Sequence, residues 1–278
     1  MFAYGTNRFV LHAYTHQPYD DPAKRTYYWK WGIRIDRHSP HLKSFKPWIA
    51  YLTAAQAKLQ RGRGVADVLR LVVDEPYLSP DDWNDREPFG YRSDVIERVH
   101  FLAAVEFSDG RLRLPSGMDY RVLALPQVRE LSPEVLKKTL ALTEAGAEVL
   151  LGPRPIGSPS LTDYPACDAE VEALAKKLWD GCPEKGSARV GRGRVWRGVD
   201  TTAVYAAIGL EPDFSATEAG RPVDPKEVVY THRVDGSTNI YFIANVTEKP
   251  KRLAVTFRSG ETREIELNGS SSVFVEYK

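Results

Sequence analysis

The chain has 278 residues, of which 42% are hydrophobic and 27% are charged, and its formal net charge is +1. This composition is typical of a globular protein and is far from that of disordered or membrane proteins. The near-neutral charge gives no field that would favour nucleic acid or an anionic membrane as a partner.

The first 60 residues predict a strand, a loop and a helix. Apolar and polar side chains alternate over NRFVLHAYTHQP (residues 7–18), as on a β-strand. On this reading Val10, His12, Tyr14 and His16 share one face. An aromatic and basic loop follows, and residues 42–62 then have helical spacing, with Pro47 tolerated in the first turn and Gly62 as a stop.

Residues 63–213 predict strands and helices in alternation. The expected strands are 64–76, two short strands within 110–127 that are separated by a turn at Ser116-Gly117, 147–152 and 193–198; the expected helices are 93–105, 132–146, 167–179 and 201–210. Ser93, Ser132 and either Thr201 or Thr202 are candidate helix caps, and Pro133 suits a first helical position. Apolar strands that alternate with amphipathic helices predict an open α/β domain with a parallel sheet covered on both faces.

Residues 225–278 predict a small antiparallel β domain. Strand-like runs are separated by the turn sequences DGS, SGE and NGS. The stretch 211–227 between the two patterns is expected to be a linker.

Most of the reactive residue types stand in patterns that favour a structural role. Cys167 lies at a helix start without the glycine-flanked turn of a nucleophile, and with Cys182 it shows neither metal-ligand spacing nor a disulfide framework. GRGRVWRG leads into a strand, which is unlike a phosphate-binding loop. On a strand, His12 and His16 would project about 7 Å apart per two-residue step, too far for a compact zinc site. The N-terminal sequence lacks the pattern of a signal peptide, and localisation stays unassigned.

The opening stretch and the aromatic residues after it allow two interpretations. Their side chains could simply hydrogen-bond and pack locally. Alternatively, they form a polar and aromatic surface at the carboxyl end of a strand, where barrel enzymes build their sites. Imidazole, phenol and amide groups suit sugar hydroxyls, and indole rings suit a sugar face. The candidate substrate-binding residues are His12, Tyr14, His16, Gln17, Trp29 and Trp31.

Several stretches, taken in chain order, resemble one family. They are NRFVLHAYTHQP, WGIRIDR, KPWIAYLTAAQAKLQRGRGVADVL, DGRLRLPSGMDYRVLALP, the block from Leu112 to Trp179, and NIYFIAN. Over nearly its whole length the chain resembles the C-terminal half of bacterial α-L-rhamnosidases of glycoside hydrolase family 106. The resemblance implies that residues 1–60 are the last strand and helix of an incomplete (β/α)8 catalytic barrel. It implies a flavodoxin- or amidotransferase-like open sheet over 61–213 and a β-sandwich-like domain over 225–278.

The resemblance also implies a chemistry. Such enzymes hydrolyse terminal α-L-rhamnosides of plant or bacterial glycans with inversion, using one carboxylic acid and one carboxylate. The glutamates with these roles, and the ligands of a calcium ion, belong to the part of the family pattern that precedes this sequence. No catalytic residue, metal ligand or cofactor is therefore assigned to this chain. The run GYRSDVIERV departs from an acidic run of the family, which puts a loop function there in doubt.

Three hypotheses follow. In the first, the chain is the C-terminal portion of a rhamnosidase-like hydrolase, nearly inactive alone and completed by a chain carrying the missing barrel strands or by self-association. In the second, it is a non-catalytic carbohydrate-binding or scaffold protein derived from that family. In the third, the α/β domain has an unrelated flavodoxin-like activity. Because an orphan barrel strand has open edges, residues 1–45 are expected to pack loosely or to be covered in an oligomer.

Overall fold

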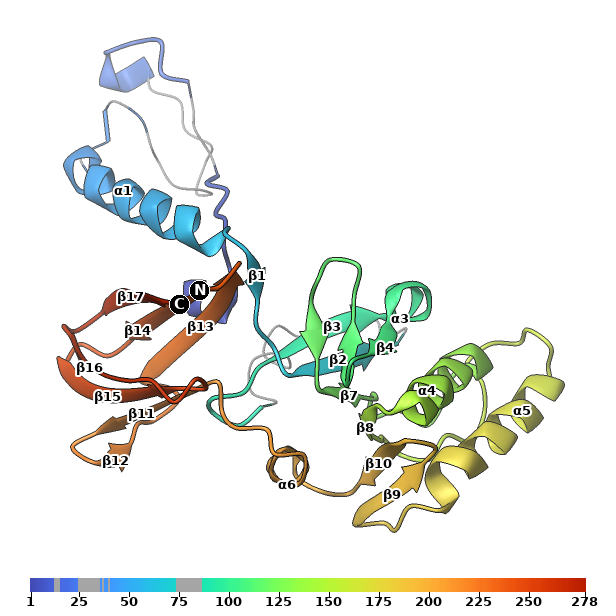
Figure 1. The fold of residues 1–278 in the computed structure, drawn as a ribbon. Coiled ribbons are helices and arrows are strands. Elements are labelled where there is room, and N and C mark those ends of the chain that lie inside the picture. The colour runs from blue at the N-terminus through green and yellow to red at the C-terminus, as the bar shows by residue number, and fades with distance from the viewer. Residues whose placement is uncertain (13–15, 25–35, 37, 40, 74–86) are drawn as a thin grey trace. The chain divides into compact units, whose positions relative to one another are not determined.

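The computed structural model describes residues 1–12, 16–24, 36, 38–39, 41–73 and 87–278 (Figure 1). Its architecture is mixed α/β with several sheets, and strands outnumber helices among these residues. Backbone contacts divide the chain into two compact units. Unit 1 comprises Met1–Arg63, Val229–Ala244 and Val273–Lys278, and unit 2 comprises Gly64–Val228 and Asn245–Ser272.

A six-stranded sheet forms the centre of unit 2. Its order is β3 (Ser93–Glu97), β2 (Val68–Val72), β7 (Val122–Ala124), β8 (Glu148–Leu150), β10 (Gly193–Arg197) and β9 (Gly186–Val190). All neighbouring pairs are parallel except β10 and β9, which are antiparallel. The parallel sheet predicted from the alternation of strands and helices is therefore present. Its likeness to flavodoxin stays a prediction.

Helices line this sheet and bury its apolar side chains. They are α3 (Arg98–Ala104), α4 (Pro133–Ala145), α5 (Ala166–Ala175), which continues as a π-helical turn over Lys176–Asp180, and α6 (Thr201–Ala207). Leu69 and Leu123 belong to the cluster that includes α4 and α5 side chains, whereas Val68 and Val122 belong to the cluster with α6 side chains. Because successive strand residues point to opposite faces, the two clusters lie on opposite faces of the sheet.

The ends of the helices follow local sequence chemistry. Helix α4 begins after Ser132 with Pro133 in its first turn and ends at Gly146, as predicted. Helix α6 is capped by Asp200 rather than by Thr201 or Thr202, because the Asp200 carboxylate accepts from the Thr202 backbone N–H at 2.8 Å. An ionised oxygen is a stronger acceptor than a hydroxyl at this position.

The predicted helix over 93–105 is wrong in its first half. Ser93 begins strand β3 instead of capping a helix, and α3 starts only at Arg98. The side chains of Val95 and Ile96 are β-branched, and the strand pairs in parallel with β2 from Ser93 opposite Val68 to Glu97 opposite Val72. Ladder pairing with a buried neighbour outweighs the helical spacing of these few residues.

Unit 2 contains two smaller sheets. One consists of β4 (Glu106–Ser108), β5 (Arg111–Arg113) and β6 (Asp119–Tyr120), and the other has the order β12 (Arg221–Pro222), β11 (Phe214–Glu218), β15 (Lys251–Phe257) and β16 (Thr262–Leu267). The predicted linker 211–227 therefore forms two strands. Burial alternates at the start of β11, where Phe214 and Ala216 are buried and Ser215 is exposed, so one face of this strand packs on a core.

Unit 1 joins the N-terminal residues to part of the C-terminal strands. Helix α1 (Leu42–Leu59) forms as predicted, although Pro47 lies in its second turn. The sheet has the order β1 (Arg63–Gly64), β13 (Val228–Asp235), β14 (Thr238–Asn245) and β17 (Ser271–Tyr277), and short 3-10 turns cover Phe2–Tyr4 and Pro22–Lys24. Phe2 and Ala3 are buried in a cluster with α1 and this sheet, so the expectation of loose packing is wrong for them.

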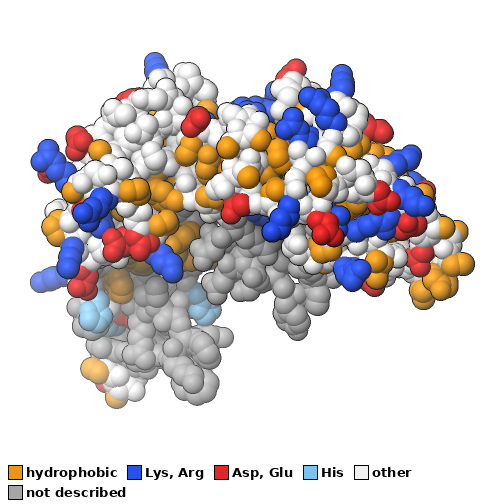
Figure 2. Space-filling model, turned by 90° about the horizontal axis from the view of Figure 1, so that it is seen from below, with side chains coloured by type: hydrophobic (Ala, Val, Ile, Leu, Met, Phe, Trp, Pro, Cys, Tyr) orange, Lys and Arg blue, Asp and Glu red, His pale blue; other side chains and the backbone are white. Residues whose placement is uncertain are grey.

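The predicted opening strand is absent from the described part of residues 7–18, that is 7–12 and 16–18. The predicted domain limits 1–60, 61–213 and 225–278 stay predictions. Among the described residues, no helix is long and apolar enough to cross a membrane. On the face shown in Figure 2, Lys and Arg side chains alternate with Asp and Glu side chains, in keeping with a net charge near zero.

Candidate functional site

The opening segment, residues 6–12, belongs to no helix or strand, and two of its backbone groups bind glutamine side chains. The Phe9 backbone N–H donates to Gln56 Oε1 at 2.6 Å, and Gln60 Nε2 donates to the Asn7 carbonyl at 3.2 Å. Gln56 lies on α1, and Gln60 is the C-cap residue directly after it. Side chains at the end of α1 thus bind this segment where a neighbouring strand was expected.

The amide orientation of Gln56 follows from its two partners. A backbone N–H can only donate, so the carbonyl oxygen of the amide must face Phe9. The amide nitrogen is then left to donate, and it does so to the Leu52 carbonyl at 3.1 Å. Gln56 is therefore fixed at both ends of its amide group.

The Phe9 side chain supplies a second attachment. Its ring meets Phe2 edge-on at 5.0 Å between centroids, and it packs against the unit 1 cluster. The neighbouring Val10 side chain is 89% exposed. Phe9 is thus held on the cluster while Val10, Leu11 and His12 after it are exposed, and no strand partner is present in the part of the chain that the structure describes.

Three of the six predicted substrate-binding residues can be placed. His12 and His16 are exposed and Gln17 is buried, and each makes polar or ring contacts with neighbouring groups. Tyr14, Trp29 and Trp31 lie outside the described residues. Whether the six side chains form one sugar-binding surface thus stays a prediction.

A second polar group near this segment was missed by the sequence reasoning. His38 Nε2 lies 3.6 Å from Asp20 Oδ1, and the His38 backbone N–H donates to Asp36 Oδ1 at 2.7 Å. The His38 side chain is only 15% exposed. An aspartate two residues before a histidine, in the loop that follows the opening stretch, is a signal that could have suggested this group.

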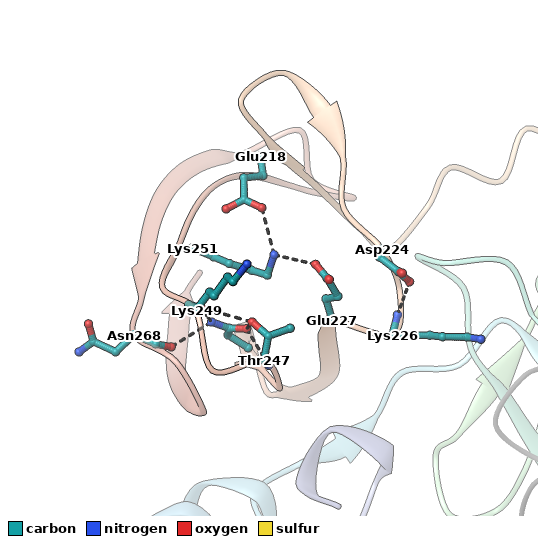
Figure 3. Close-up of polar contacts among 9 residues, drawn as sticks. Glu218, Asp224, Lys226, Glu227, Thr247, Lys249, Lys251 and Asn268 are labelled. Atoms are coloured by element: carbon teal, nitrogen blue, oxygen red, sulfur yellow. Dashed lines mark hydrogen bonds and ion pairs between the residues drawn. The ribbon is translucent and has the colours of Figure 1, made fainter.

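Paired carboxylates, which glycoside hydrolysis needs, also occur far from the opening segment in sequence. Figure 3 shows Lys251 Nζ between Glu218 and Glu227, at 3.0 and 2.7 Å. The Lys251 side chain is 8% exposed, and its hydrogen bond to Glu227, followed by that to Glu218, raises the pKa of the ammonium group. The ammonium ion thus stays charged and holds both carboxylates, which suits a structural role at the edge of β15.

The loop beside this ion pair is fixed by one buried amide. Asn245 Nδ2 donates to the Lys249 and Asn268 carbonyls, and its Oδ1 accepts from the backbone and hydroxyl of Thr247 (Figure 3). Both hydrogens of the amide nitrogen and both lone pairs of the amide oxygen are therefore used. Hydrogen bonds and ion pairs thus hold Lys251 and the neighbouring loop around Asn245 in place within unit 2.

A buried carboxylate, that of Glu87, is bound by Arg70 and by the Tyr205 hydroxyl. Burial raises the pKa of Glu87, while the charge of Arg70 opposes this change. Burial and the Glu87 charge raise the pKa of Tyr205, so the phenol stays a donor. Within the residues that the structure describes, no cluster of three or more His, Cys, Asp or Glu residues could hold a metal ion.

Comparison with known proteins decides the family. The sequence model of glycoside hydrolase family 106, described as alpha-L-rhamnosidase, matches residues 1–272. The chain belongs to this family. The family resemblance drawn from the sequence motifs is confirmed.

Similar proteins are considerably longer than this chain. A rhamnosidase from Novosphingobium sp. PP1Y superposes with a TM-score of 0.79 and 27% identity, over 99% of this chain and 28% of that one. A Formosa agariphila protein named "Putative beta-glucuronidase" is 31% identical over 92% of this chain and 20% of its own length. A β-galactosidase from Bacillus circulans sp. alkalophilus shares only the fold, with a TM-score of 0.54 and 11% identity over 87% of this chain and 46% of that one. The chain thus spans 20% of the length of the Formosa protein and 28% of the length of the Novosphingobium rhamnosidase.

Proposed function

We propose that this chain is the C-terminal portion of an α-L-rhamnosidase-like glycoside hydrolase, and that it binds the sugar without carrying the hydrolytic carboxylates. The observation that supports this most is the match of the family over residues 1–272 together with the superposition on a rhamnosidase over 99% of the chain. The acid and the base would come from other residues of a longer polypeptide or from a partner chain.

Inverting hydrolysis sets a geometric requirement. The two carboxyl groups stand about 6.5–9.5 Å apart, so that a water molecule fits between one of them and the sugar. In this chain the carboxylates of Glu218 and Glu227 share one ammonium ion, and Glu87 is bound by a guanidinium group. A carboxylate held this way is a poor general base, because releasing it leaves a cation unpaired.

Sugar recognition is assigned to the opening segment. His12, His16 and Gln17, with Tyr14, Trp29 and Trp31, supply donors and acceptors for hydroxyl groups and ring faces for stacking. The glycone we favour is L-rhamnose, because both the family description and the superposed structure name a rhamnosidase. The relative named for glucuronide makes a β-D-glucuronide the competing substrate to test.

The first test combines binding and turnover. L-rhamnose is titrated into the chain by calorimetry, and 4-nitrophenyl α-L-rhamnoside and β-D-glucuronide are assayed for hydrolysis. We expect rhamnose binding without release of nitrophenol. Hydrolysis by the chain alone would contradict the proposed lack of a catalytic pair, and the absence of binding would contradict the sugar-binding role.

A matched pair of variants localises the binding. His16→Ala should weaken rhamnose binding about tenfold, the effect of losing one or two hydrogen bonds to a ligand. His100→Ala serves as control, because His100 is another exposed histidine, on α3, with a 73% exposed side chain. Equal affinities of the two variants would place the sugar elsewhere.

Complementation separates this proposal from a non-catalytic binding or scaffold protein. The Novosphingobium rhamnosidase is truncated to remove the region that this chain matches and is mixed with the chain. Restored hydrolysis of the rhamnoside supports the proposal that the chain is part of a rhamnosidase-like hydrolase. Binding of rhamnose without hydrolysis in this mixture favours a non-catalytic binding or scaffold protein.

A further inference from the structure

We propose that Gln56 is a positioning residue that sets the register of the opening segment and so determines how His12 is presented. The inference rests on the proposed sugar-binding role of that segment, but its geometric content can be tested without sugar. Gln56 does not belong to the predicted site, and it acts through the backbone of Phe9.

The spacing of the two glutamines matches the spacing of an extended chain. Gln56 on α1 and the C-cap residue Gln60 are four residues apart, a rise of about 6 Å along a helix. Their partners, the Phe9 N–H and the Asn7 carbonyl, are two residues apart, a rise of about 6.6 Å along a strand. Polar backbone groups of residues i and i+2 point to the same edge of a strand. The helix therefore offers one acceptor and one donor at the interval that a paired strand would offer.

Gln56 is the stronger of these two attachments. Its bond to Phe9 is part-buried and its amide is held from the other side by the Leu52 carbonyl, whereas the bond from Gln60 is exposed and longer. Removing the Gln56 oxygen would leave a part-buried N–H without its acceptor, which costs more than removing an exposed bond.

Register controls which side chains face the core. A slip by one residue turns every side chain of an extended segment to the opposite face. With Phe9 fixed by both its ring and its N–H, the next residue, Val10, is exposed, and so is His12, three residues after Phe9. The bond to Gln56 thus ties the orientation of His12 to helix α1.

The experiment compares three variants with the wild-type chain. Gln56→Leu removes both hydrogen bonds, and Gln56→Glu keeps an acceptor oxygen for Phe9. Gln127→Leu is the control, because it places the same change at an exposed glutamine of unit 2. The readouts are amide hydrogen exchange of Phe9 and the imidazole NMR signals of His12, with the thermal midpoint as a check on folding.

In Gln56→Leu we expect Phe9 exchange to be at least tenfold faster and the His12 signals to shift or broaden, with the thermal midpoint close to that of Gln127→Leu. Gln56→Glu should rescue the Phe9 protection. Unchanged Phe9 exchange and His12 signals in Gln56→Leu would overturn the inference. Where these changes occur, rhamnose titration of the wild type then tests the proposed function separately, because a chain that never binds rhamnose contradicts the function and leaves the positioning role intact.

Discussion

At the scale of single residues, the ion pair between Asp67 and Arg258 offers a test, because it holds a deeply buried carboxylate. The Asp67 side chain is 3% exposed, and Arg258 donates to its two oxygens at 2.7 and 2.8 Å. Burial raises the pKa of Asp67, while the hydrogen bond and charge of Arg258 oppose that change. The pair therefore offsets the cost of burying the carboxylate.

Replacing Arg258 by methionine should destabilise unit 2 by about 3 kcal/mol, because it leaves the buried carboxylate without its cation. The measurement is the urea dependence of unfolding at neutral pH. Arg252→Met is the matched control on β15, the strand that ends just before Arg258: Arg252 is 74% exposed, and its carboxylate neighbours lie 3.7 and 3.8 Å away. It should cost less than about 0.5 kcal/mol. Equal losses would contradict a special role for the buried pair.

Glu276 gives the free energy of unfolding a pH dependence of opposite sign to that caused by a buried acid whose pKa is raised. Hydrogen bonds from Lys58 and then Arg61 lower the pKa of this carboxyl. A lowered folded-state pKa means that the stabilisation is present above the unfolded value, about 4.3, and is lost as the pH falls through the folded value.

We therefore expect Glu276→Gln to destabilise the chain at pH 7 by about 0.5–1 kcal/mol, since the partners are about 40% exposed and screened by water. At pH 3 the difference from wild type should shrink. A double-mutant cycle with Lys58→Met at both pH values measures it. A coupling energy that is independent of pH would refute the assignment.

At the scale of elements, the junction of α1 and β1 depends on a glycine. Gly62 has a φ of +55°, and a Cβ there would lie 2.0 Å from the Val234 carbonyl oxygen. Gly236 has almost the same φ, +59°, but nothing within 4 Å of its Cβ position. The two sites therefore separate backbone strain from steric contact.

Gly236→Ala should cost about 1 kcal/mol, the usual penalty of a left-handed conformation for alanine. Gly62→Ala should cost at least about 2 kcal/mol more, because the backbone of β13 must move as well. Chemical denaturation of both variants measures the difference. If both lose the same stability, the strand adapts freely and the close approach has no structural consequence.

The sequence predicts those elements whose signals are local. Ser132, Pro133 and Gly146 mark the ends of α4, and the glycine turns mark the C-terminal strands. It fails where a distant partner decides: β3 forms because β2 lies beside it, and β11 forms within the supposed linker because β15 pairs with it. The candidate site shows the same limit. Alternation over 7–12 predicts a strand that does not form among the described residues, and nothing local reveals that Gln56 and Gln60 bind this segment instead.

At the scale of the whole molecule, neither of the two compact units is one continuous stretch of the chain. Unit 1 takes residues from the first 63 positions and from two separate stretches of the C-terminal strands. A family assignment rests on the entire sequence, whereas folding of this unit depends on contacts across more than 200 positions, such as Phe2 with Phe242. Few such contacts are legible in sequence, which is why the predicted loose packing of the N-terminal residues is wrong for Phe2.

Phe2 is thus expected to stabilise unit 1 although it lies next to the first residue. Its ring is 6% exposed and meets Phe9, Tyr51 and Phe242 at centroid distances of 5.0, 6.1 and 5.7 Å. Phe2→Ala should cost about 3 kcal/mol, as for other buried aromatic rings. Tyr4→Ala, in the same turn but 52% exposed, should cost little.

Hydrogen exchange locates the effect of Phe2→Ala. Exchange of amides in β14 of unit 1 should be faster, while amides in β8 of unit 2 keep wild-type rates, because β14 contributes Phe242 to the cluster around Phe2 and β8 contributes no residue to it. Equal acceleration in both strands would mean that the two units unfold as one. A wild-type rate in β14 would mean that the N-terminal residues lie on the cluster without stabilising it.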